Sequence, residues 1–95
     1  MKPETVIRAI EHVVGVPQDK WDGGPCMRGK DWKARGELYG HNAVLVVCHD
    51  GGVLAPYFNY DYEAYSLVEK MVAALNAIGA WAEPCTPWYT AIYKQ

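Results

Sequence analysis

The feature that most constrains the fold is a long amphipathic pattern between Asp61 and Gly79. Its apolar residues recur at steps of three and four, as they do along one face of an α-helix. They are Ala64, Leu67, Val68, Met71, Val72, Leu75 and Ile78. Asp61 is suited to cap the first turn, and Gly79 is suited to end the helix in a left-handed conformation. The pattern predicts one long helix over these residues.

A second helix is predicted from Pro3 to Val14. Proline is tolerated in a first turn because its missing N–H has no partner there, and Gly15 provides a natural end. The apolar face of this helix comprises Val6, Ile7, Ile10, Val13 and Val14.

Two hairpins are predicted around the long helix. Ala43–Cys48 is an apolar run rich in β-branched residues, which predicts a central strand covered on both faces. Asp50-Gly51-Gly52 is typical of a tight turn, so we expect Val53–Phe58 to return as the partner strand. Ala80–Glu83 and Trp88–Tyr93 predict the second hairpin.

The predicted fold class is therefore α+β, with a four-stranded and mainly antiparallel sheet packed with two helices. The expected order is helix, loop, hairpin, helix, hairpin. The 95 residues are enough for one domain with one core, so residues 1–95 are read as a single domain. A content of 51% apolar and 21% charged residues is ordinary for a globular chain.

Charge and composition weigh against several classes of function. A net charge of -2 creates no field that would attract nucleic acid or a membrane surface. No apolar run is long enough to span a bilayer, and residues 1–20 lack the apolar segment of a signal peptide. We therefore expect a cytoplasmic protein whose three cysteines are free thiols. No cofactor motif and no metal-ligand spacing is present, so neither is expected.

Residues 18–40 form a long segment without clear periodicity, apart from a weak strand pattern at Glu37–Tyr39. Such segments in compact domains are often functional. One interpretation is a recognition loop whose tryptophans anchor a partner and whose basic residues meet acidic groups or phosphate. The residues concerned are Trp21, Arg28, Lys30, Trp32, Lys33 and Arg35. The other interpretation is a compact loop that packs its tryptophans onto the core.

Tyrosines gather before the long helix. Tyr57, Tyr60, Tyr62 and Tyr65 lie within nine residues, and the chain has seven tyrosines against one phenylalanine. Tyrosine combines apolar area with a polar tip and little rotamer entropy, which is why it is enriched in binding surfaces. This favours partner binding through Tyr57, Tyr60 and Tyr62. The alternative is that the rings only attach the start of the helix to the sheet.

The segment Pro56–Met71 resembles the phage ABA-sandwich domain family of small phage and prophage proteins. In that family a Pro-Tyr opening leads into a helix with a tryptophan, a Val-Val pair and Glu-Lys-Met. Here Pro56 and Tyr57 match the opening, and Tyr65 stands in the tryptophan's place. Leu67, Val68, Glu69, Lys70 and Met71 continue the match, while Phe58-Asn59-Tyr60 replaces a polar triplet. The resemblance implies a phage or prophage accessory protein with an α+β sandwich, and the family offers no known catalytic residues to carry over.

Three hypotheses follow. The first is a non-enzymatic protein-binding module, of phage or prophage origin, that modulates or inhibits a host protein such as a component of a defence system. The second is single-stranded nucleic-acid binding, with Trp21, Trp32 and Tyr39 as stacking platforms and the basic residues of the loop on phosphates. The third is a small enzyme that uses His41, Cys48, His49 or Asp50. A protein partner is expected, a homodimer is left open, and a membrane partner is not expected.

Overall fold

The computed structural model describes residues 1–95 as four α-helices, two short 3-10 helices and four strands. In chain order these are α1 (Pro3–Val14), η1 (Gln18–Lys20), β1 (Cys26–Met27), α2 (Gly29–Ala34), β2 (Leu45–Cys48), α3 (Ala55–Phe58), η2 (Tyr60–Tyr62), α4 (Tyr65–Ala77), β3 (Ala80–Thr86) and β4 (Tyr89–Lys94). The predicted α+β class is confirmed. None of the helices combines the length and apolar character needed to cross a membrane.

The four strands form one antiparallel sheet in the order β1-β2-β4-β3. Strand β2 is central and all four of its residues are buried, as its apolar sequence predicts. It pairs with β4 so that Leu45 lies opposite Ile92. Strands β3 and β4 form the predicted C-terminal hairpin, in which Trp81 lies opposite Tyr93 and an irregularity occurs between Pro84 and Thr86.

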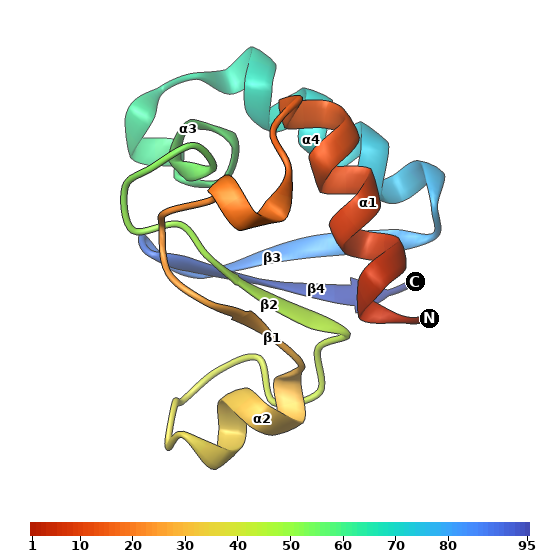
Figure 1. Ribbon diagram of the computed structural model, residues 1–95, viewed down its shortest axis with the longest axis vertical. Helices are drawn as coiled ribbons and strands as arrows, with labels where there is room; N and C mark the ends of the chain where they lie inside the picture. Colours follow the sequence, from red (N-terminus) through yellow and green to blue (C-terminus); the bar gives the residue numbers. More distant parts are fainter.

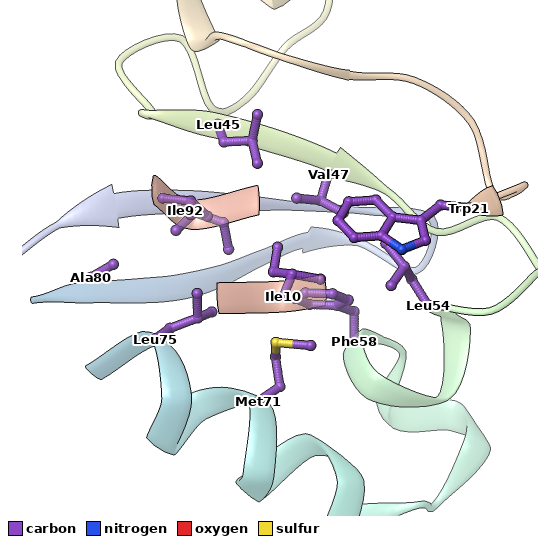
Figure 2. Packing of buried hydrophobic residues seen from close by; sticks show 11 residues of the cluster. Ile10, Trp21, Leu45, Val47, Leu54, Phe58, Met71, Leu75, Ala80 and Ile92 are labelled. Carbon is purple, nitrogen blue, oxygen red and sulfur yellow. The ribbon is translucent and has the colours of Figure 1, made fainter. Parts of the chain in front are cut away.

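Helices cover both faces of the sheet (Figure 1). Helices α1, α3 and α4 lie on one face, and α2 lies on the other. The larger core cluster lies under the first group, and Figure 2 shows Trp21, Met71, Leu75 and Ile92 converging there. A second cluster of six buried residues occupies the opposite face around Trp32. The sheet therefore separates two apolar cores.

The predicted hairpin partner of β2 is wrong, because Val53–Phe58 does not form a strand. Both edges of β2 are already paired, with β1 on one side and β4 on the other. The chain after Gly51 and Gly52, which do have positive φ angles, turns into α3 instead. Leu54 and Phe58 are buried at helical spacing. The fourth strand comes from Cys26–Met27, inside the predicted loop.

The start of the long helix and the weak strand pattern also differ from the prediction. The long helix begins at Tyr65, and its N-cap residue Ala64 makes no side-chain cap. Asp61 belongs to η2, where the side chain of Asn59 accepts a hydrogen bond from its N–H at 2.9 Å. The weak strand pattern at Glu37–Tyr39 forms no strand. Asn59 thus caps a short 3-10 turn, and α4 begins later, at Tyr65.

Candidate protein-binding surface

The two loop tryptophans are core residues, so the prediction that they stand at the surface as anchors is wrong. Trp21 belongs to the larger cluster, and its Nε1–H donates to the carbonyl oxygen of Val16 at 2.9 Å. Trp32 is fully buried in the second cluster, with its ring 4.9 Å from that of Tyr89. The alternative interpretation, in which the loop packs its tryptophans onto the core, describes both residues.

The basic residues of the same segment do not form one patch with the tryptophans. The guanidinium carbon of Arg35 lies 4.8 Å above the buried ring of Trp32, where it makes a cation–π contact. Arg28 and Lys30 line a separate cleft, and Lys33 is exposed on α2. Two of the three stacking platforms expected for a single strand of nucleic acid, Trp21 and Trp32, are therefore covered, while the third, Tyr39, is 54% exposed.

Three of the four tyrosines around the start of α4 are exposed. Tyr60, Tyr62 and Tyr65 show 49%, 53% and 55% of their surface to solvent, while Tyr57 is half-buried. Tyr60 and Tyr62 lie in η2, and Tyr65 begins α4. Glu63 joins the two with a left-handed conformation at φ 56°. This turn places the three rings at the junction of the helices.

Two hollows lie beside these rings, and Tyr60 lines both. One, of about 390 Å³, extends along α4, and its apolar wall includes Tyr65 and Val72. The other, of about 250 Å³, extends toward the bulged end of β3 and includes Pro84 and Pro87. Tyr60 also lines a much smaller apolar hollow between α4 and β3. We call the exposed tyrosines Tyr60, Tyr62 and Tyr65, together with the two larger hollows, the tyrosine surface.

The charge of the tyrosine surface is acidic. Asp61 lines one hollow and Glu69 lines the other. Neither hollow has a lysine or arginine in its wall. An incoming group that is apolar and carries positive charge at its border would therefore fit this surface best.

Sequence reasoning identified the tyrosines of this surface but missed its apolar floor. Val72 was assigned to the buried stripe of the long helix, yet it is exposed and lines the hollow along α4. The buried stripe of α4 consists of Val68, Met71 and Leu75. The long helix has more apolar residues than one buried stripe needs, and this excess was the signal that one of them could be exposed. Pro84 could not be placed, because its position depends on how β3 packs against α4.

The residues of the enzyme hypothesis do not converge. His49 is buried, its ring stacks on Phe58 at 5.4 Å, and its Nε2 is hydrogen-bonded to Oγ1 of Thr90 at 2.9 Å. Burial lowers the pKa of His49 to about 4, which keeps the ring neutral at pH 7.

The thiol of the neighbouring residue, Cys48, is equally unsuited to act as a nucleophile. Cys48 belongs to the core cluster on the other face of the sheet, and burial raises its pKa to about 12. A nucleophilic cysteine requires a lowered pKa and access to solvent. The Nε2–H of His41 donates to the carbonyl oxygen of Glu37 at 2.5 Å. Nowhere do three or more His, Cys, Asp or Glu side chains gather as they would around a metal ion.

Comparison of the chain with models of known protein families, with curated proteins and with solved structures finds no match. The function is therefore inferred from the residues and geometry of the surface itself.

Proposed function

We propose that this protein is a non-enzymatic binding module that holds a protein partner at the tyrosine surface. The observation that carries the proposal is the position of Tyr60, a half-exposed ring that borders all three of the hollows described above. A partner that fills either hollow must contact this ring.

The energetics of interfaces support this role. Tyrosine is among the residues that dominate binding energy, and such anchors lie beside pockets at the centre of an interface. The side chain of Tyr60 is held by a short 3-10 helix whose cap is hydrogen-bonded through Asn59. A ring on a fixed element loses less conformational entropy on binding than one on a mobile loop. Tyr62 and Tyr65 flank it and extend the contact area.

The partner that fits is a protein segment with apolar side chains bordered by lysine or arginine. The apolar side chains would enter the hollow formed with Val72, and the cations would face Asp61 and Glu69. Both carboxylates are exposed, so their contribution is mainly to the rate of association and to specificity. Most of the affinity comes from the rings.

The resemblance of residues 56–71 to the phage ABA-sandwich family directs the choice of partner. We infer a cytoplasmic phage or prophage accessory protein whose partner is a host protein, with components of defence systems as the first class to test. The nucleic-acid and enzyme hypotheses are less well supported, because the loop tryptophans are buried and His49 and Cys48 are enclosed in the core.

Site-specific photo-crosslinking tests the proposal. A benzophenone side chain is introduced in place of Tyr60, and a matched variant carries it in place of Tyr39, which is also half-exposed but lies outside the tyrosine surface. After irradiation in bacterial cells, we expect a discrete covalent adduct from position 60 and none from position 39. The adduct is identified by mass spectrometry and confirmed with the purified partner.

Two outcomes would overturn the proposal. Equal crosslinking from both positions, or from neither, would mean that the tyrosine surface holds no specific partner. A crosslink from position 60 to a second copy of the chain, with a matching dimer in sedimentation experiments, would replace the foreign partner with a homodimer.

A further inference from the structure

Another hollow, of different chemistry from those beside Tyr60, lies where α1 begins. It is a cleft of about 370 Å³ lined by residues 1–3, Arg28, Lys30 and residues 41–44. Lys2, Arg28 and Lys30 bring three positive charges to it from two distant parts of the chain, and no aspartate or glutamate lines it. The whole chain has a net charge of -2, whereas the side chains that line this cleft carry a net positive charge. It shares no residue with the tyrosine surface.

The backbone around Gly29 positions two of the basic residues, Arg28 and Lys30. The N–H of Gly29 donates to the carbonyl oxygen of Ala43 at 3.1 Å. A Cβ at Gly29 would lie 2.5 Å from Ala43 N and 2.5 Å from Gly40 O, so the chain can approach this closely only with glycine. Arg28 and Lys30 flank this contact, and their Cα positions are therefore held against the segment that forms the opposite wall.

Lys2 and the polar side chains of His41 and Asn42 complete the lining of the cleft. Lys2 is the N-cap residue of α1, and its carbonyl oxygen accepts a hydrogen bond from Thr5 N–H at 3.1 Å. Asn42 contributes an amide that can donate. The ring of His41 is oriented by its bond to Glu37. The residues that carry these donors thus stand on a defined backbone.

We propose that this cleft binds the phosphate group of a small phosphomonoester. A phosphate presents several oxygens and needs several donors, which a guanidinium and ammonium groups supply together. The volume is at the lower end of the range for small-molecule pockets, so it exceeds what a bare phosphate ion fills and leaves space for an attached organic group. The inference is independent of the protein-binding role of the tyrosine surface.

The test is a titration followed by two-dimensional amide NMR in low-salt buffer, with inorganic phosphate in one arm and adenosine monophosphate in the other. We expect saturable shifts confined to amides near residues 2–3, 28–30 and 41–44, with a Kd at or below about 1 mM for the nucleotide. The nucleotide should bind several-fold more tightly than phosphate, because only it has an organic group to fill the remaining volume.

Charge-matched variants complete the experiment. The double variant Arg28→Gln, Lys30→Gln should weaken nucleotide binding by about tenfold or more, since it removes two charge-assisted contacts. The control Lys20→Gln, Lys70→Gln removes the same charge from exposed positions outside the cleft and should change the affinity less than about twofold. All four side chains are exposed, so we expect both double variants to fold. The amide spectra verify this for each variant.

Several results would overturn the proposal. These are shifts that do not saturate, shifts scattered over the surface, and equal weakening by both double variants. Tighter binding of a single-stranded oligonucleotide than of the mononucleotide, with shifts that extend well beyond the cleft, would assign these charges to nucleic acid instead.

Discussion

Replacing Trp32 with alanine should strongly destabilise the protein, because this residue forms the centre of the second core. Its side chain is fully buried, and its ring lies 4.9 Å from Tyr89 and 5.8 Å from Trp88. Truncating a buried tryptophan to alanine costs about 3–5 kcal/mol. Domains of this size are stable by only about 5–15 kcal/mol, so the variant would lose a large part of its free energy of unfolding.

Urea denaturation followed by far-ultraviolet circular dichroism measures the effect. With an m-value of about 1.5 kcal/mol/M, a loss of about 4 kcal/mol lowers the unfolding midpoint by about 2.7 M. Leu38→Ala is the matched control, since Leu38 comes from the same segment of the chain but is 76% exposed. Its cost should stay within about 0.5 kcal/mol.

A loss below about 1 kcal/mol for Trp32→Ala, or equal losses for the two variants, would refute the reasoning. Either result would mean that Trp32 does not support the packing of α2 on the sheet. Trp32 would then again be a candidate anchor for a partner, as the recognition-loop interpretation proposes.

Three other predictions concern the fold and its buried groups. Gly29→Ala should cost about 2 kcal/mol or more in thermal unfolding, because its Cβ would meet backbone atoms of residues 40–43; an unchanged melting temperature would contradict the close approach. The pKa of His49 lies near 4 in the folded state and near 6.5 when unfolded, so the unfolded state binds the proton first and stability falls as the pH drops from about 6.5 to about 4. Chemical denaturation should therefore give about 2–3 kcal/mol less stability at pH 4.5 than at pH 7, and His49→Gln should show a clearly smaller difference. Cys48 should resist thiol reagents at pH 8 in the folded protein and react once urea is added; rapid reaction without urea would show that it is not enclosed.

Local patterns were sufficient to predict the elements that form from their own residues. Helix α1 spans Pro3–Val14 as predicted, because its proline in the first turn, its apolar face and the Gly15 that ends it are all local in sequence. The C-terminal hairpin was also predicted, since its strands are neighbours in sequence. The two faces of β4 follow from alternation, with Ile92 in one core cluster and Ala91 in the other.

The errors arose where pairing depends on distant parts of the chain. The turn after β2 has the positive φ angles expected of a hairpin, but Asp50 N–H donates to Gly23 O and Val53 N–H donates to the Asp22 side chain. These bonds connect the turn to the 18–40 segment, which no local pattern reveals. The burial of Trp32 depends likewise on α2 folding back beneath the sheet.

The candidate binding surface was predicted only in part, for the same reason. An exposed cluster of tyrosines could be expected from composition and spacing around Tyr60. The hollows beside it could not, because they form between α4, η2 and the end of β3. The basic cleft was missed altogether, since it unites Lys2 with Arg28 and Lys30 through tertiary contacts.

The most direct test of the protein-binding role is the affinity of the purified crosslinked partner for three forms of the protein, measured by isothermal titration calorimetry. We expect Tyr60→Ala to weaken binding by about 30-fold or more, as the loss of a central aromatic anchor of about 2 kcal/mol implies, while Tyr39→Ala changes it less than about threefold. Similar affinities for the parent protein and Tyr60→Ala, with both proteins folded, would contradict the assignment of the tyrosine surface as the binding site.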